Sequence, residues 1–234
     1  MIVHVVERAL SARNVARAIV ATDDRRIQDA VLSAGFEAVM TRADHASGSD
    51  RLAEVAAALD DADVIVNLQG DEPLVSPRTI ERAVDELLKD EAAHIVTTSE
   101  AIADAADVLS PDVVKVVTDA SGRALYFSRS PVPYPRDAVR LHGTLAAALE
   151  AEPRLLAAFR KHTGLYVYRR AFLLEYTRWP QSALERAESL EQLRALERGA
   201  VIKVIEADSP SIGVDTEEDL ERVRKIFTEA NGEW

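Results

Sequence analysis

The stretch DVIVNLQGDEP, residues 63–73, decides the fold. Its first six residues are an apolar run of strand length, and Gly70 and Pro73 then end the strand in a loop. Further apolar runs at 17–22, 36–40, 94–98 and 201–205 alternate with helical patterns. Strands that alternate with helices of ten to fifteen residues are typical of α/β proteins. The sequence therefore predicts an α/β fold in which helices cover both faces of a mostly parallel sheet.

The middle of the chain has a different pattern. Residues 113–118 and 123–128 flank a DASG turn, which predicts a β-hairpin with Gly122 in the turn. A further strand is expected at 164–168, after an Ala-rich helical stretch at 144–161 that Pro153 interrupts. We therefore expect one domain over 1–234, with a small antiparallel subdomain at 113–170. One helix is expected at 183–198, ended by Gly199.

Composition excludes several classes of protein. The 234 residues carry 40 acidic and 28 basic side chains, a formal net charge of −12, which argues against a partner that is a nucleic acid. The absence of cysteine excludes disulfides, thiolate nucleophiles and cysteine zinc sites. No secretory signal or membrane-spanning run is visible, so the expectation is a cytoplasmic protein without a membrane partner.

Two aspartates are candidate metal ligands. Asp71 follows the most apolar strand, and ligands of open α/β sheets bind at the carboxyl ends of strands, where a carboxylate suits Mg²⁺. Asp215 precedes the last helix. Each also has a structural interpretation, Asp71 as a turn residue and Asp215 as a charge that favours a helix N-terminus.

The segment TRADHASGSDR, residues 41–51, is a candidate anion site. Its Ser47-Gly48 turn opens a helix, where free backbone N–H groups point outward, and Arg42 and Arg51 add positive charge that suits phosphate. The alternative is a capped surface loop.

A third candidate set lies further along the chain. Arg129 could bind a carboxylate through both of its guanidinium nitrogens, and Tyr166 and Tyr168 share one face of a strand. Arg129 and His162 could equally be a surface residue and a structural histidine. Glu191 and Arg194 would by default form a solvated pair on a helix.

Taken together, six motifs in order from Met1 to about Arg224 resemble the 3-deoxy-manno-octulosonate (Kdo) cytidylyltransferase family. They are TRADHASGSDRLAEV, VNLQGDEP, RALYFSRSPVP, HTGLYVYRRAFL, SLEQLRALERG and GVDTEEDLERV. The resemblance implies a nucleotide-diphospho-sugar transferase fold and a homodimer, with the subdomain at 113–170 serving the substrate and the dimer. It also implies an activity, the reaction of Kdo with CTP to CMP-Kdo and pyrophosphate for lipopolysaccharide synthesis.

The resemblance also assigns site residues. Asp71 and Asp215 match the family's metal-binding and catalytic aspartates, with Mg²⁺ as the cofactor. The positions expected at the nucleotide are Arg42, Asp44, Ser47, Gly48, Arg51 and Gln69; those expected at the sugar acid are Arg129, His162, Tyr166, Glu191 and Gln192. The alternatives are an inactive or fragmentary relative, or an enzyme for another sugar acid such as 8-amino-Kdo or a sialic acid.

One part of the family pattern is not matched. The family opens with a strand and a loop containing glycine, arginine and lysine that wraps the triphosphate, and Met1 aligns inside the helix that follows. The resemblance therefore implies a domain truncated at its N-terminus, with a sheet that lacks a central strand. Residues 137–160 are the least family-like and border the expected sugar pocket, which bears on which sugar acid is used.

Overall fold

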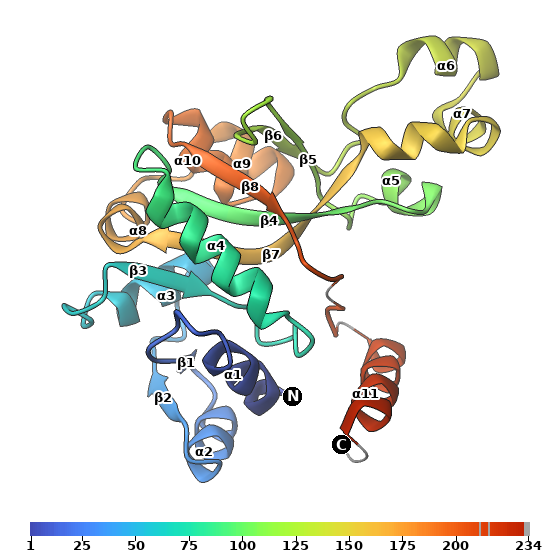
Figure 1. The fold of residues 1–234 in the computed structure, drawn as a ribbon. Coiled ribbons are helices and arrows are strands. Elements are labelled where there is room, and N and C mark those ends of the chain that lie inside the picture. The colour runs from blue at the N-terminus through green and yellow to red at the C-terminus, as the bar shows by residue number, and fades with distance from the viewer. Residues whose placement is uncertain (211, 215, 232–234) are drawn as a thin grey trace.

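A six-stranded sheet lies at the centre of the computed structural model, which describes residues 1–210, 212–214 and 216–231 (Figure 1). Strand β7 is its longest, and β4 pairs along one side of it while β3 and β5 pair with its two ends on the other side. The edges are β8, beside β4, and β6, beside β5. The strands are β3 (Val64–Asn67), β4 (Ile95–Ala101), β5 (Lys115–Thr118), β6 (Ala124–Ser128), β7 (Arg160–Arg169) and β8 (Ile202–Glu206).

Strand directions refine the predicted sheet. Strands β3, β4 and β5 are each antiparallel to β7 and therefore run the same way, and β8 is parallel to β4. Four strands thus share one direction, whereas β6 and β7 run against them. Most direct pairings are antiparallel because β7 lies between the parallel strands, an arrangement that the apolar runs alone do not reveal.

Helices cover both faces of this sheet, which confirms the predicted α/β class. Neighbouring residues of one strand point to opposite faces, and Ile95 packs in a core with helices α8 and α10 while Val96 packs in a second core with α4. The helices are α1 (Ile2–Leu10), α2 (Arg25–Ser33), α3 (Gly48–Ala56), α4 (Pro77–Lys89), α5 (Ala105–Leu109), α6 (Arg136–His142), α7 (Leu145–Ala151), the 3-10 helix η1 (Pro153–Ala158), α8 (Arg170–Tyr176), α9 (Ala183–Glu188), α10 (Gln192–Glu197) and α11 (Glu217–Asn231). None of the helices in the described part of the chain combines the length and apolar composition that crossing a membrane requires.

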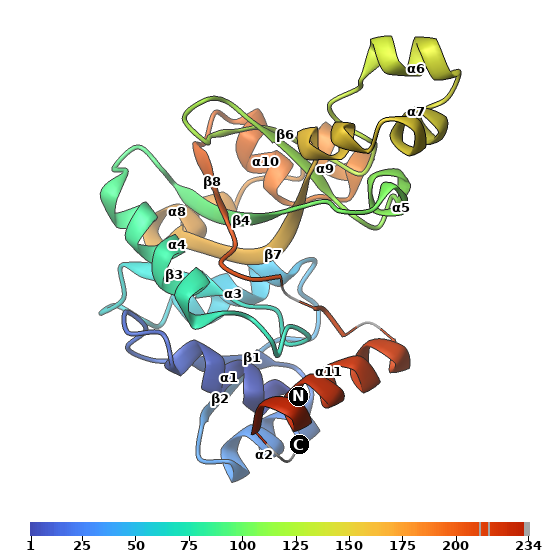
Figure 2. The ribbon, with the colours of Figure 1, turned by 45° about the vertical axis from the view of Figure 1, so that its right-hand side comes forward.

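A separate pair of parallel strands, β1 (Ile19–Thr22) and β2 (Glu37–Met40), lies beside β3 (Figures 1 and 2). No described strand pairs with both β1 and β3, and a cavity of about 550 Å³ separates them. Residues of β1 and β3 line it from the sides, and residues of α1 and α3 line it from above and below. The cavity therefore lies in the plane of the sheet, between its two helical layers.

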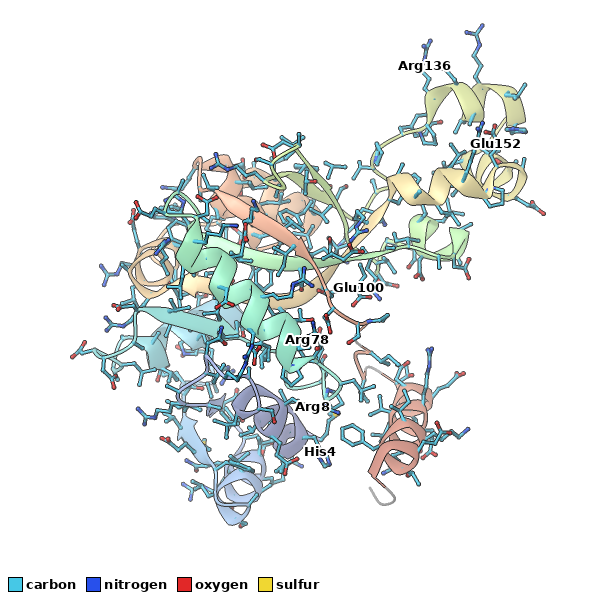
Figure 3. The ribbon with its side chains drawn as sticks, viewed as in Figure 1. His4, Arg8, Arg78, Glu100, Arg136 and Glu152 are labelled. Atoms are coloured by element: carbon cyan, nitrogen blue, oxygen red, sulfur yellow. The ribbon has the colours of Figure 1, made fainter. Side chains whose placement is uncertain are left out.

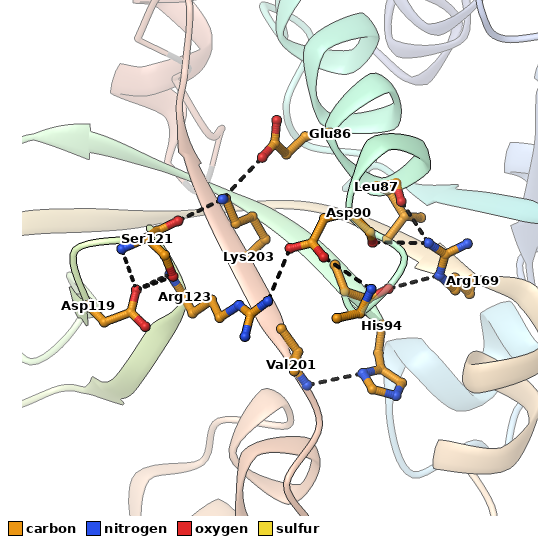
Figure 4. Close-up of polar contacts among 12 residues, drawn as sticks. Glu86, Leu87, Asp90, His94, Asp119, Ser121, Arg123, Arg169, Val201 and Lys203 are labelled. Carbon is orange, nitrogen blue, oxygen red and sulfur yellow. Dashed lines mark hydrogen bonds and ion pairs between the residues drawn. The ribbon is translucent and has the colours of Figure 1, made fainter.

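The predicted hairpin is confirmed at β5 and β6, and Gly122 has φ +79 in its turn. Asp119 closes the turn by accepting from the backbone N–H groups of Ser121 and Arg123. Lys203 of β8 donates to the carbonyl of Ser121 at 2.6 Å and pairs with Glu86 of α4 at 3.1 Å (Figure 4). These contacts tie the hairpin to the main sheet.

The predicted single helix at 183–198 is wrong. The structure has two helices, α9 and α10, separated at Ser189, which adopts a left-handed conformation with φ 53. Contacts with a distant strand produce the break, because the Glu188 carboxylate accepts from Ser128 Oγ at 2.7 Å and from the Arg129 N–H at 2.8 Å. Gly199 follows α10 with φ +78, as expected for a glycine that ends a helix.

Helices α6 and α7 project from the body of the molecule (Figures 1 and 2). Pro153 begins the 3-10 helix η1, as predicted, while α5, α6 and α8 are short helices that we did not predict individually. Arg136 and Glu152 mark the projection, and both lie far from the central sheet (Figure 3). Leu141 on α6 is 74% exposed, which leaves an apolar surface at the tip.

Candidate active site

The loop after β3 brings Asp71 to the carboxyl end of the strand, as predicted. Asp71 Oδ1 is buried and has no hydrogen-bond partner among the described residues. A buried carboxylate oxygen without a donor is costly, and a hard cation would satisfy it. The donor chemistry of Asp71 therefore fits Mg²⁺, although the described residues contain no group of three or more acidic or histidine side chains that could hold a metal.

The other predicted metal ligand, Asp215, lies outside the described residues. Its preceding residue is described, and the Val214 N–H donates to the carbonyl of Asp71 at 2.9 Å. After it, Thr216 and Asp219 cap α11 through reciprocal side-chain hydrogen bonds to backbone N–H groups, which together form a capping box. The segment 212–214 therefore runs beside the Asp71 loop.

Helix α11 is held near this loop by contacts with α1. The His4 ring lies 4.8 Å from the Phe227 ring, centroid to centroid, and the Arg8 guanidinium carbon lies 5.8 Å from the centre of that ring. His4 and Arg8 point from α1 toward α11 (Figure 3). These contacts anchor the C-terminal helix beside the start of the chain.

Gly164 lets the Asp71 loop approach β7 closely. A Cβ atom at position 164 would lie 2.9 Å from Glu72 Oε1 and 3.1 Å from Gln69 Cγ, both shorter than ordinary contacts. A side chain at this position would therefore displace the side chains of Glu72 and Gln69. The segment that carries Gln69 thus lies against β7, the strand that carries His162 and Tyr166.

The residues predicted at the nucleotide fall into two groups. Gly48, Arg51 and Gln69 all line the cavity between β1 and β3. Arg51 donates to Thr41 Oγ1 at 2.6 Å and pairs with Asp23 at 3.1 Å, so its guanidinium is held in place.

Arg42 and Asp44 do not join the group that lines the cavity. Both are exposed and lie 3.3 Å apart, Nε to Oδ1. Ser47 caps α3 by accepting from the Asp50 N–H. This contact is expected both for a capped surface loop and for a turn that binds an anion.

His162 and Tyr166 meet on β7. The His162 ring lies 5.0 Å from the Phe127 ring, edge to face, and 5.3 Å from the Tyr166 ring. Burial lowers the pKa of His162 to about 3 and raises the pKa of the Tyr166 hydroxyl well above its ordinary value. Both side chains are therefore neutral near pH 7. Tyr168 stacks on Tyr166 at 5.8 Å, so the two tyrosines share a face as predicted.

Arg129 has main-chain partners in this structure. Its Nε donates to the carbonyl of Glu188 at 2.7 Å and its Nη1 donates to the carbonyl of Pro111 at 2.9 Å. The buried Lys115 ammonium donates to the carbonyl of Arg129 at 2.6 Å, and its pKa is lowered because burial disfavours the charge. A role for Arg129 in gripping a substrate carboxylate stays a prediction.

Glu191 and Gln192 lie at the start of α10, just after the break at Ser189. Gln192 is buried, and its Nε2 has no hydrogen-bond partner among the described residues. The carbonyl of Glu191 accepts from the Tyr176 hydroxyl at 2.8 Å, which fixes the backbone at this point. Gln192 Nε2 is therefore a buried donor without an acceptor in the described part of the chain.

The expected solvated pair of Glu191 and Arg194 does not form. Arg194 is 4% exposed and binds Glu185 through two hydrogen bonds, of 2.5 and 2.8 Å. The pairing raises the pKa of Arg194, chiefly through its hydrogen bond with Glu185. This buried ion pair joins α9 to α10 across the break.

Sequence reasoning missed four residues that support the site: Thr97, Lys115, Gly164 and Glu188. Thr97 hydrogen-bonds His162 at 2.9 Å, 65 positions away, and Glu188 contacts β6 about 60 positions away. No local pattern marks such long-range partners. Only Gly164, a glycine inside a strand, carries a sequence signal of a bulge or close approach.

Comparisons with known proteins find relatives of similar sequence and a solved structure of similar fold. A family model described as cytidylyltransferase matches residues 1–206. The 3-deoxy-manno-octulosonate cytidylyltransferases of Trichlorobacter lovleyi and Geobacter sulfurreducens are each 52% identical, over 96% and 95% of this chain and 87% of each relative. A solved structure of a CMP:2-keto-3-deoxy-manno-octonic acid synthetase complexed with CTP is 43% identical, covers 98% of this chain and 88% of that one, and has a TM-score of 0.85. The chain therefore belongs to the cytidylyltransferase family, among the 3-deoxy-manno-octulosonate cytidylyltransferases.

Proposed function

We propose that this chain activates Kdo with CTP, forming CMP-Kdo and pyrophosphate for lipopolysaccharide synthesis. The observation that carries the proposal is its likeness to the CTP-bound synthetase over nearly the whole chain, at 43% identity. In the reaction, the anomeric hydroxyl oxygen of Kdo forms a bond to the α-phosphorus of CTP. The bond from that phosphorus to the β-phosphate oxygen breaks, the hydroxyl proton is lost, and pyrophosphate leaves.

The nucleotide would occupy the carboxyl ends of β1 and β3. Gly48, Arg51 and Gln69 line one cavity there, and the held guanidinium of Arg51 offers a fixed positive charge. The sugar acid would lie against His162, Tyr166, Glu191 and Gln192. The buried, unpartnered Gln192 Nε2 would donate to a sugar oxygen.

Asp71 and Asp215 would hold Mg²⁺. The support is the partnerless Asp71 Oδ1 and the hydrogen bond that brings residue 214 to the Asp71 loop. When bound, the metal supplies positive charge that neutralises the triphosphate and lowers the pKa of the attacking hydroxyl. The Asp71 backbone, which accepts from Val214, would keep the two carboxylate-bearing segments together.

The direct test measures pyrophosphate release by the purified 234-residue chain with CTP, Kdo and MgCl₂. Release should require all three components, and Asp71→Asn should lower kcat/KM at least ~100-fold, as loss of a group that stabilises developing charge does. Asp29→Asn, at an exposed aspartate on α2, is the matched control and should keep full activity. Release with 8-amino-Kdo or a sialic acid, but not with Kdo, would reassign the sugar. No release with any of them would favour the inactive relative.

We also propose a cytoplasmic homodimer. CTP is a nucleotide of the cytoplasm, which supports that compartment for the reaction. The exposed apolar side chains of Tyr134, just before α6, and Leu141, on α6, support a dimer surface at the projecting helices. Light scattering of the purified chain measures its mass in solution and tests the dimer directly.

A further inference from the structure

Thr97 lies in the middle of β4 and is fully buried. Its hydroxyl oxygen contacts two groups: the carbonyl oxygen of Leu165 at 2.7 Å and Nε2 of His162 at 2.9 Å. Both belong to β7, the strand that pairs with β4. One hydroxyl therefore links the backbone of β7 to the imidazole ring.

A shift in the β4–β7 ladder creates this arrangement. Thr97 faces Tyr166 across the ladder, but the next residue, Thr98, faces Thr163, so Gly164 and Leu165 have no opposite residue on β4. The carbonyl of Leu165 is thus available to a side chain rather than to the regular ladder. The same bulge contains Gly164, which allows the Asp71 loop to approach.

Counting protons fixes the tautomer of His162. A threonine hydroxyl has one hydrogen and two lone pairs, and a carbonyl oxygen has no hydrogen to share. At 2.7 Å the hydroxyl must therefore donate to Leu165, since two oxygens this close without a hydrogen between them would repel. The hydroxyl then accepts from His162, so Nε2 carries the proton and Nδ1 carries a lone pair.

The surroundings of the ring keep it neutral. His4, His45 and His142 each lie against a glutamate carboxylate. His162 has no carboxylate partner in the described part of the chain and packs between the Phe127 and Tyr166 rings. Burial also lowers its pKa to about 3. Its Nδ1 has no hydrogen-bond partner among the described residues.

We propose that Thr97 is a positioning residue that holds His162 in the Nε2–H tautomer, so that Nδ1 accepts a hydrogen bond from a hydroxyl group of the sugar acid. A neutral acceptor selects a hydroxyl donor and repels a carboxylate oxygen. The carboxylate of the substrate therefore binds elsewhere in the site. The assignment of the ligand rests on the proposed function, whereas the tautomer does not.

The tautomer is tested by ¹⁵N NMR of the full chain labelled at histidine, with His162→Gln used to assign the His162 signals. The expected spectrum near neutral pH shows a protonated Nε2 and an unprotonated Nδ1. A protonated Nδ1, or an imidazolium with both nitrogens protonated, would overturn the proposal. The wild-type spectrum, assigned with this variant, decides the tautomer and requires no enzyme activity. Its outcome is therefore independent of whether the proposed function is correct.

The role in substrate binding is tested with Thr97→Val, Thr97→Ser and the matched control Thr98→Val. Thr98 is the next residue on β4, also buried, and its hydroxyl contacts Thr163 instead of the histidine. Thr97→Val should raise KM for Kdo roughly three- to tenfold, the equivalent of one hydrogen bond, with KM for CTP unchanged. Thr97→Ser should restore both KM and the ¹⁵N signals. Unchanged imidazole signals in Thr97→Val, or an equal rise in KM in Thr98→Val, would refute the positioning role.

Discussion

The cavity between β1 and β3 should accept one added β-strand. We would fuse an apolar segment of about five residues, such as five valines, ahead of Met1 through a Gly/Ser loop of about six residues. Met1 is a suitable attachment point because Ile2 Cδ1 lies within 3.3 Å of a Cβ built on Gly70, just beyond the carboxyl end of β3. A strand parallel to β3 would end beside it.

The magnitude follows from the lining of the cavity. Its walls include the apolar residues Val20, Val66, Val5 and Leu52 and the free edges of β1 and β3. A buried valine contributes ~2 kcal/mol, ordering each residue costs ~1.5 kcal/mol, and each main-chain hydrogen bond adds ~1 kcal/mol. Five residues and about four such bonds give a net ~6.5 kcal/mol, which corresponds to a rise in Tm of ~13–26 °C for a chain of this size.

Thermal unfolding followed by circular dichroism measures the effect. The control fusion replaces the five valines with Gly and Ser at the same length, so that any effect of the tether itself is shared. The apolar fusion should unfold at a clearly higher temperature than the control and with a sharper transition. Equal Tm values for the two fusions would refute the reasoning, because the cavity would then not be a strand site.

Three further predictions follow from the buried groups and from the projecting helices. Because burial lowers the pKa of His162 from 6.5 to about 3, the unfolded chain binds a proton that the native chain does not. The free energy of unfolding should fall as pH drops from 6.5 toward 3, by up to ~1.4 kcal/mol per pH unit, and urea titrations of His162→Gln should show a smaller slope. Arg194→Met should destabilise the chain by ~3–5 kcal/mol, since it leaves the buried Glu185 uncompensated, while the double variant Glu185→Leu/Arg194→Met should recover much of that loss in chemical denaturation. Leu141→Glu should convert the proposed dimer to monomers in light scattering with the Tm unchanged; a persisting dimer would place the interface elsewhere.

Local patterns predicted the elements whose causes are local. The apolar run at 63–68 contains β3, and Gly122 and Gly199 lie where a turn and the end of a helix were expected, with φ +79 and +78. The break at Ser189 was not predictable in this way. The Glu188 carboxylate just before it accepts hydrogen bonds from Ser128 and Arg129, which lie about 60 positions away in the sequence. The partner of Arg194 was missed for a related reason, since Glu185 reaches it only once that break has formed.

The same distinction between local and long-range causes applies to the residues of the candidate site. Asp71 was predictable because a carboxylate after an apolar strand lies at the edge where α/β proteins bind ligands. The state of His162 was not, since it depends on a two-residue bulge opposite Thr97. A histidine in a sequence shows that a proton acceptor is present, whereas its tautomer depends on a hydroxyl that only the paired strands bring into contact.

Polar atoms without partners define what the site lacks. Asp71 Oδ1 and Gln192 Nε2 are buried without a hydrogen bond among the described residues. Each of these two buried groups costs ~1–3 kcal/mol unless a ligand satisfies it. His162 Nδ1, on a half-buried side chain, also has no partner in the described part of the chain. The three needs differ: Asp71 requires a cation or a donor, Gln192 an acceptor and His162 a donor. A hydroxyl group both accepts and donates, so a ligand rich in hydroxyls can meet the last two needs with one kind of group, while a metal ion meets the first. A purely apolar ligand of equal size would leave all three unmet.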